Sequence, residues 1–574
     1  MPRESSRRVV SGASEGVASR VVYVTSQPDE DGFGAEVGDG FDPDLTRGNA
    51  TILTQASFRL TVDKLVTALT DVEPWEPYWE DLSVLDLRDK GLEGVVKLKD
   101  MCPKLGEVGL NNNHLCYLTG VPTTVRILHA ARNKLTSLTS YAHLTRLEHL
   151  DINGNEVDSL GHLGALKRLR TLKASGNQIE SVDGICHSAE LVRLELAGNH
   201  ISCIDFEKCE WPKLELLDIS RNRISEVRNL REDILPRLTL LNLDNNCLSV
   251  LHFDLPRCFA SLRVLRVSYN NLTSLDVGLL TNLKTFYADG NRFGEGSKSS
   301  KSSALEGTPP NKAITNLHKL TRLENFSARG KGRLYLEGRD LRDTRRIYLS
   351  GTILSTSLFT DACYNLVYLE LAACRLTSST ATAPAATGDP STGLAPRDSN
   401  LTVLPPLFRF TPNVRVLNLN YNFLENLQAL HELRRVRKLT VVANRVKGSK
   451  ELVRLTKEMP DLELCDFRMN PCTLGWYFPL LQLGGRSDEP GADPRIHVDD
   501  GRASANAQWH DLDQQFRRDL PNDSYVGRLA YRGLIMQSCA ELRSLDGVTV
   551  TDKERKKASE LLAMLSESKA QRAR

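Results

Sequence analysis

One pattern, L-x-x-L-x-L-x-x-N-x-L, recurs along most of this chain of 574 residues. Two clear copies run from Leu147 to Val157 and from Leu191 to Ile201. A period near 22 residues indicates a repeat array, because one such unit buries its apolar face only by stacking on its neighbours. The first position of the pattern falls at 82, 105, 125, 147, 169, 191, 214, 238, 262, 283, 323, 344, 366, 414, 436 and 462.

Each copy predicts a short strand followed by a return segment. Alternation along the strand sends positions 4 and 6 into the core and positions 3, 5 and 7 to the concave surface. Position 9 turns the chain, and an asparagine amide there is expected to bond the backbone groups freed by the turn. Cys374 takes this position in its copy and is predicted to be a structural thiol. The asparagines are Asn113, Asn133, Asn155, Asn177, Asn199, Asn222, Asn246, Asn270, Asn291, Asn422, Asn444 and Asn470.

This pattern is the leucine-rich repeat, and its short period is typical of the intracellular type with 3₁₀ or helical backs. The predicted fold class is an α/β leucine-rich-repeat solenoid, a curved parallel sheet with helical caps at both ends. A cap helix is expected near 60–71, with Trp75 and Trp79 shielding the first strand edge. The predicted domains are a disordered tail over 1–55, a cap helix and lead-in over 56–81, the array over 82–480 with loop inserts at 295–315 and 377–412, a loop over 481–522, and a C-terminal cap with a final helix over 523–574.

Composition and motifs exclude several classes of function. The chain holds 74 Lys and Arg against 72 Asp and Glu, so a net charge of +2 gives no general attraction to nucleic acid. No uninterrupted apolar segment predicts a membrane span, and the first residues lack the apolar core of a signal peptide. No phosphate-binding loop, zinc-protease, hydrolase or kinase signature occurs, and the histidines lack metal spacing. We therefore predict no catalytic, cofactor or metal-binding residues and no small-molecule substrate.

What remains is a surface for binding other proteins. Position 3 is aliphatic in three successive copies, and tyrosine and arginine follow at positions 5 and 8 nearby. Such side chains are favoured anchors of protein interfaces, although a single aliphatic residue at position 3 is common in idle repeats. A basic stretch over 434–450 fits equally an acidic or phosphorylated partner and a solvated ridge. The predicted protein-binding residues are Leu216, Leu240, Val264, Arg266, Tyr269 and Tyr287.

Four segments carry a more specific resemblance: PWEPYWEDLSVLDLRDKGLEGVVKLKDMCPKL, LNNNHLCYLTGVPTTVRILHAARNKLTSLTSYAHLTRLEHLDINGNEVDSLGHL, RMNPCTLGWYFPLL and YRGLIMQSCAELRSLDGV. Together they resemble the C-terminal repeat region of the fungal septation-initiation and mitotic-exit network scaffolds of the spindle pole body. Animal centriolin is a more distant relative of the same style. The resemblance covers roughly residues 60–560.

The resemblance implies a non-enzymatic scaffold located in the cytoplasm on the spindle pole body, a part of the cytoskeleton. The implied partners are a spindle-pole-body anchor protein and the GTPase module and kinases of septation and mitotic exit. Family members usually carry a long N-terminal extension that recruits kinases, whereas about 55 residues precede the array here. We therefore expect the anchoring role to carry over better than the signalling role. The alternative is a regulatory subunit holding a Ser/Thr protein phosphatase 1-type enzyme on the concave face.

Overall fold

The computed structural model describes residues 59–254, 258–294, 312–377, 398–480 and 503–572. The predicted disordered tail over 1–55 lies outside these ranges, as do 295–311 and 378–397 of the two predicted inserts. Within the described helices, we find no stretch with the length and apolar character that crossing a bilayer requires.

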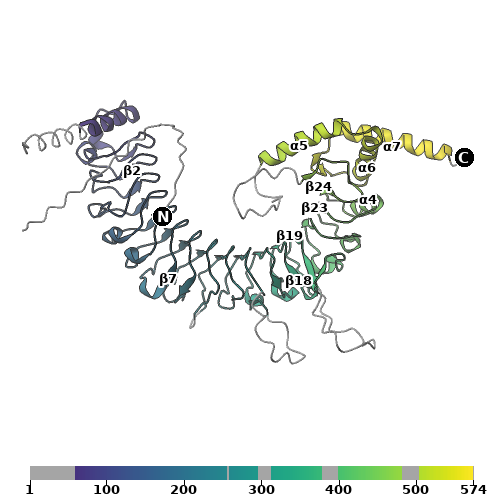
Figure 1. Cartoon of the computed structure of the whole chain (residues 1–574), viewed down its shortest axis with the longest axis horizontal. Coiled ribbons are helices and arrows are strands. Elements are labelled where there is room, and N and C mark those ends of the chain that lie inside the picture. Colours follow the sequence, from purple (N-terminus) through teal and green to yellow (C-terminus); the bar gives the residue numbers. More distant parts are fainter. Residues whose placement is uncertain (1–58, 255–257, 295–311, 378–397, 481–502, 573–574) are drawn as a thin grey trace, which may run out of the picture. The chain divides into compact units, whose positions relative to one another are not determined.

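Sixteen repeat strands run parallel in one continuous sheet, and each begins two residues after a predicted first position (Figure 1). The pairing register is constant, so Leu217 lies opposite Leu241, which lies opposite Leu265. The predicted parallel solenoid is therefore confirmed. The strands are β1 (Val84–Asp86), β2 (Glu107–Gly109), β3 (Ile127–His129), β4 (His149–Asp151), β5 (Thr171–Lys173), β6 (Arg193–Glu195), β8 (Leu216–Asp218), β10 (Leu240–Asn242), β11 (Val264–Arg266), β13 (Thr285–Tyr287), β15 (Asn325–Ser327), β17 (Arg346–Tyr348), β19 (Tyr368–Glu370), β22 (Val416–Asn418), β23 (Lys438–Thr440) and β24 (Leu464–Asp466).

Two further strands end this sheet. Strand β25 (Ser544–Leu545) pairs parallel to β24, and β26 (Val548–Thr549) then pairs antiparallel to β25. The short turn between them uses Asp546 and Gly547, both with positive φ. The last parallel strand is thus covered by a strand that reverses direction.

The return segments form three small sheets and several short helices. The small sheets pair β7 (Cys203–Asp205) with β9 (Glu226–Arg228), β12 (Leu275–Asp276) with β14 (Ile314–Thr315), and join β16 (Arg333–Leu334), β18 (Ile353–Ser355), β20 (Arg375–Thr377) and β21 (Asp398–Asn400). The short helices are η1 (Trp79–Asp81), α2 (Leu98–Met101), η2 (Gly161–Ala165), η3 (Asp183–Ile185), η4 (Phe206–Lys208), η6 (Leu317–Lys319), η7 (Gly338–Leu341), η8 (Thr356–Phe359), α3 (Leu407–Phe410), η9 (Gln428–Leu430) and α4 (Ser449–Lys457).

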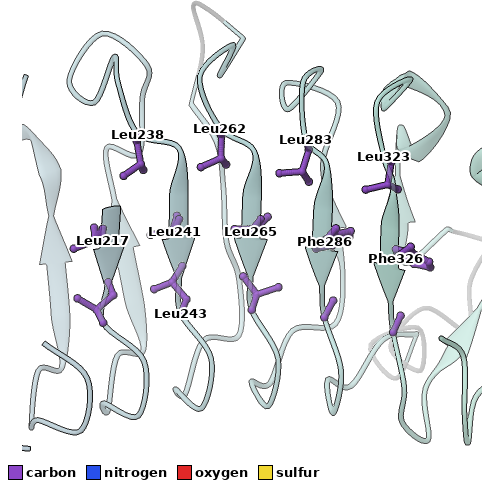
Figure 2. Packing of buried hydrophobic residues seen from close by; sticks show 14 of the residues in the cluster. Leu217, Leu238, Leu241, Leu243, Leu262, Leu265, Leu283, Phe286, Leu323 and Phe326 are labelled. Atoms are coloured by element: carbon purple, nitrogen blue, oxygen red, sulfur yellow. The ribbon is translucent and has the colours of Figure 1, made fainter. Parts of the chain in front are cut away.

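The core consists of columns of equivalent residues. Figure 2 shows Leu217, Leu241 and Leu265 at position 4 of neighbouring strands, with Phe286 and Phe326 continuing the column. Each of these five side chains is buried. Because every copy contributes the same positions, one hydrophobic cluster extends through the whole array.

The asparagine column performs the predicted structural role. Asn155 donates from Nδ2 to the carbonyl oxygens of Ala130 (3.0 Å) and Ile152 (2.9 Å), while its Oδ1 accepts from the N–H of Leu135 (3.0 Å). The other predicted asparagines are buried as well. Cys374 replaces this amide with a buried thiol whose Sγ donates to the carbonyl of Leu349 at 3.0 Å. Each amide thus connects neighbouring copies through groups that would otherwise be buried without partners.

The N-terminal cap contains a helix that includes 59–72 and buries Leu65 and Leu69. Trp79 in η1 packs partly buried against the core. The shielding role predicted for Trp75 is wrong, because its side chain is 93% exposed. Pro74 ends the helix near this point, so the chain leaves the cap before the indole can reach the strand edge.

Two predicted loops contain regular structure. Part of the 377–412 insert forms β21 and α3, because Leu401, Leu404, Leu407 and Phe410 recur every third residue and are buried. The composition of the Ser/Thr/Pro-rich part obscured this apolar spacing. In the same way, the end of the 295–315 insert belongs to β14, which pairs with β12.

The predicted loop over 481–522 is also wrong in part, because helix α5 (Ala503–Arg518) lies within it. Trp509 of α5 is 4% exposed and donates from Nε1 to the carbonyl of Phe478 at 3.2 Å. Phe516 meets Phe478 with 6.2 Å between ring centroids. The burial of Trp509 and the contact of Phe516 with Phe478 stabilise α5 against the rest of the cap. Helices α6 (Asn522–Ser538) and α7 (Asp552–Arg572) follow, and the Thr551 hydroxyl accepts from the N–H of Glu554 at 3.2 Å as the first turn of α7 begins.

Candidate protein-interaction surface

The face of the main sheet that carries positions 3 and 5 is here called the strand face. Leu216, Leu240 and Val264 lie directly opposite one another on β8, β10 and β11, and we call them the aliphatic row. Each of the three side chains is half-buried. The row is therefore contiguous, as predicted from the repeat, but its neighbours cover part of its apolar surface.

Three predicted residues flank the aliphatic row. Arg266 donates from Nε to Asp244 Oδ2 at 2.7 Å, and its guanidinium carbon lies 5.6 Å from the centroid of the Tyr287 ring. Tyr269 lies in the turn after β11 and is 57% exposed. Its ring packs over Gly290, where a Cβ would lie 2.6 Å from Tyr269 Cδ1. Arg266 and Tyr287 are thus held on the strand face, and Tyr269 forms its rim.

The structure adds a second set of side chains on the strand face, which we call the tyrosine–arginine cluster: Asp289, Arg329, Tyr348, Tyr368 and Glu370. Arg329 binds Glu370 through two hydrogen bonds of 2.8 and 3.0 Å, and its guanidinium lies 4.7 Å from the Tyr348 ring centroid. Tyr348 and Tyr368 pair with 4.7 Å between centroids. Asp289 Oδ1 accepts from the N–H of Arg329 at 2.7 Å.

Burial shapes the electrostatics of this cluster. Desolvation raises the pKa of Asp289 against the lowering effects of Ser327 and Arg329. Burial acts to lower the pKa of Arg329, but its hydrogen bonds to Glu370 and the charges of Glu370 and Asp289 raise it overall. The guanidinium therefore stays charged in a fixed orientation, which suits a preorganised anchor for a partner.

Sequence reasoning missed this cluster, although a signal for it existed. Tyr348 occupies position 5 of the copy starting at 344, and Tyr368 occupies position 3 of the next copy. Arg329 occupies position 7 of the copy starting at 323. These positions share a face with the aliphatic row, so scoring the exposed positions of every copy would have found them.

The basic stretch over 434–450 is partly engaged within the molecule. Arg435 donates to Asn413 Oδ1 at 2.8 Å, Arg437 lies 3.6 Å from Glu463, and the Arg445 guanidinium lies 4.6 Å from the Phe423 ring centroid. Over the described ranges, His, Cys, Asp and Glu side chains form no group of three suited to a metal ion.

The C-terminal cap buries charged groups rather than amides. Arg528 donates from Nη2 to Asp513 Oδ2 at 2.6 Å, and both side chains are 4% exposed. Arg532 donates to the carbonyl of Leu545 at 2.7 Å and to Glu554 Oε2 at 3.0 Å. Because Arg532 reaches both β25 and α7 from α6, it fastens the final helices to the end of the sheet.

Asp546 lies at the centre of this cap and is fully buried. Its carboxylate accepts from the N–H of Phe467 at 2.7 Å and from the Tyr477 hydroxyl at 2.6 Å. Burial and the neighbouring charge of Asp466 raise the pKa of Asp546 to about 6.

The repeat pattern and the parallel sheet define a leucine-rich-repeat protein. The chain is 31% identical over 509 residues to the septation initiation network scaffold protein cdc11 of Schizosaccharomyces pombe (strain 972 / ATCC 24843). The match includes 87% of this chain and 44% of that protein, so the chain spans less than half the length of this curated relative. The resemblance predicted from the sequence is confirmed: the chain is similar to this septation initiation network scaffold over 87% of its own length. No family model matches it.

Solved structures agree with the fold. A leucine-rich-repeat protein of Leptospira interrogans superimposes with a TM-score of 0.52 at 20% identity, covering 68% of this chain and 91% of that one. The functional domain of InlJ from Listeria monocytogenes reaches a TM-score of 0.48 at 19% identity, covering 68% of this chain and 74% of that one. At 20% identity the first likeness establishes the fold alone.

Proposed function

We propose that this protein is a non-enzymatic scaffold that anchors septation-initiation and mitotic-exit signalling at the spindle pole body. The observation that carries the proposal is the similarity to a protein named as a septation initiation network scaffold, which extends over 87% of this chain. The proposed partners are a spindle-pole-body anchor protein and the GTPase module and kinases of this signalling network. The proposed location is the cytoplasmic spindle pole body.

The part of the strand face from β8 to β19 is the proposed contact surface for the principal partner. From β8 to β19 the strands are consecutive neighbours in the sheet, so the aliphatic row and the tyrosine–arginine cluster together span about 29 Å at ~4.8 Å per strand. This span suits an interface of standard size, in which about 800 Å² is buried on each partner. Apolar anchors at one end and an oriented guanidinium at the other would supply binding energy and register.

The phosphatase alternative receives no support from the relatives described above. A direct comparison of the two proposals is an affinity purification from dividing cells followed by mass spectrometry. Spindle-pole components and kinases are expected among the retained proteins. A phosphatase catalytic subunit recovered at equal stoichiometry, in place of those proteins, would favour the alternative.

The first prediction concerns the aliphatic row. A variant carrying Leu216→Glu, Leu240→Glu and Val264→Glu is expected to lose the fluorescent spot that the tagged wild-type protein forms at the poles of dividing cells. Three carboxylates would place charge in the apolar part of the interface without partners. Because the three side chains are half-buried and not in the core, the variant should lose less stability than a core substitution would cost, and its thermal transition checks that it folds.

A matched control keeps the same substitution at the same repeat position. Ile127, His149 and Thr171 occupy position 3 of β3, β4 and β5, lie opposite one another, and are half-buried. Glutamate at these three positions should leave the spot at the poles intact. A wild-type signal that is diffuse throughout mitosis would contradict the proposed function. A normal spot from the Leu216, Leu240 and Val264 variant would remove the aliphatic row from the contact surface.

A further inference from the structure

A hollow of about 620 Å³ lies in the C-terminal cap, bounded by α5, α6, β26 and the start of α7. Six of its fifteen lining residues are arginine or lysine, whereas one is acidic. The basic residues are Arg517, Arg518, Arg528, Arg532, Lys553 and Lys557, and the acidic residue is Glu554. The hollow is therefore strongly positive, although the chain as a whole has a net charge of only +2.

The buried cations of the hollow are already neutralised by the cap. Arg528 is paired with Asp513, and Arg532 with Glu554. Lys557 is exposed, and its Nζ donates to the Tyr525 hydroxyl at 2.9 Å, a hydrogen bond that orients the ammonium group without compensating its charge. These contacts fix the floor of the hollow before any ligand arrives.

The cations at the rim are different. Arg517, Arg518 and Lys553 are exposed, and among the described residues none of the three forms an ion pair. Asp519 and Asp523 follow closely in the sequence but do not line the hollow. Two guanidinium groups and one ammonium group thus lie around the rim of the hollow. The side chains at its floor already have bonding partners within the cap.

We propose that this hollow binds a phosphorylated segment of a partner protein. A phosphate group carries a charge of about −1.5 to −2 with three acceptor oxygens, and guanidinium forks match it through paired hydrogen bonds. Leu520, Leu529 and Val548 also line the hollow and would receive the apolar side chains beside the phosphorylated residue. A half-open hollow of this size suits one short peptide segment, whereas nucleic acid is bound along an extended basic stripe.

This binding site lies on α5–α7 and is separate from the strand face. Failure of this proposal would leave the contact assigned to the aliphatic row untouched. Partner binding in the hollow is predicted to depend on phosphorylation, whereas partner binding at the aliphatic row is not.

The test measures fluorescence polarisation of a labelled degenerate heptapeptide pool with phosphothreonine at its centre, using the full chain. The same pool with threonine is the comparison. The full chain should bind the phosphorylated pool at least about tenfold more tightly. A variant with Arg517→Glu, Arg518→Glu and Lys553→Glu should lose at least about tenfold in affinity, equivalent to about 1.4 kcal/mol.

The matched control makes the same change of charge elsewhere. Lys167, Arg168 and Arg322 are exposed residues outside the hollow, and glutamate at all three should leave binding within about twofold. If the charge-reversed variant does not fold, judged by its thermal transition, Arg517→Gln with Arg518→Gln and Lys553→Gln replaces it. Equal binding of both pools, equal losses in the hollow and control variants, or tighter binding of a labelled single-stranded oligonucleotide than of the phosphorylated pool would each overturn the proposal.

Discussion

The repeat array and the C-terminal cap solve the same problem, the burial of polar groups, in different ways. In the array, neutral asparagine amides recur once per copy and bond the backbone of neighbouring copies. In the cap, charged pairs such as Arg528 with Asp513 are buried once and are not repeated. An amide serves wherever the local geometry is the same, whereas a charge pair needs one particular arrangement of three helices and a strand.

This difference predicts that the array and the cap respond differently to a destabilising substitution. In a repeat array each copy is stabilised by its nearest neighbours, so the loss of stability caused by one substitution is distributed over neighbouring copies. A broken buried ion pair leaves an unpaired charge, and its cost falls on the elements that surround it. The cap should therefore be lost as a unit while the array persists.

The largest expected effect is that of Arg528→Ala, which leaves the carboxylate of Asp513 buried without its partner. We expect the cap to be destabilised by about 3–5 kcal/mol. The measurement is hydrogen exchange of the amides in α5 and α6 compared with those of β8–β11.

A compensating double variant provides the control for this prediction. Asp513→Leu combined with Arg528→Met removes both charges and should recover most of the lost stability, because an apolar pair can replace a buried ion pair. Equal loss of protection in the array and in the cap after Arg528→Ala would contradict the separation of the two regions.

The next effect is expected in the array. Leu217→Ala removes a fully buried side chain from the column in Figure 2 and should cost about 2–5 kcal/mol in the free energy of unfolding. Leu216→Ala, one residue earlier on the strand face and half-buried, should cost less. Urea titration of both variants decides the point, and equal losses would show that the two positions do not differ as their burial indicates.

The smallest of these effects depends on pH and arises from a buried carboxyl group of the cap. The pKa of Asp546 is raised from an ordinary value of 3.8 to about 6, so the folded cap binds a proton more readily than the unfolded chain. The contribution of this group to stability is therefore present below about pH 4 and is lost as the pH rises through about 6.

Asp546→Asn should remove this dependence. Asparagine tolerates the positive φ of 53° at this position. Its Oδ1 can accept from the N–H of Phe467, and its Nδ2 can donate to the Tyr477 hydroxyl, which reverses the direction of that bond. Relative to the wild type, the variant is expected to gain stability as the pH rises from about 4 to about 7. Parallel curves for the two proteins, measured by urea unfolding across this range, would show that the buried carboxyl carries no such cost.

The sequence predicts the array well because the information is local. Each strand begins two residues after a pattern position, and each predicted asparagine is buried where its turn requires it. The pattern also placed Leu216, Leu240 and Val264 in one row, since register in a solenoid follows from the period alone.

The same reasoning could not reach the cap. Arg528 meets Asp513 across two helices, and such a pair depends on how separate segments pack, which no periodic spacing indicates. The tyrosine–arginine cluster was within reach, because Arg329 and Glu370 occupy repeat positions on the strand face, but it was missed. Helix α5 was missed because the Gly- and Pro-rich composition of its surroundings outweighed the short aromatic spacing of Trp509 and Phe516.

The strand β26 has a consequence for behaviour at high local concentration. An open parallel strand is a template onto which another molecule can add its own strand, and growth by that route has no natural limit. The reversal from β25 to β26 occupies that template on β25, and Arg532 joins α6 to the same strand. A second molecule is therefore unable to continue the parallel array by pairing its own strand with β25.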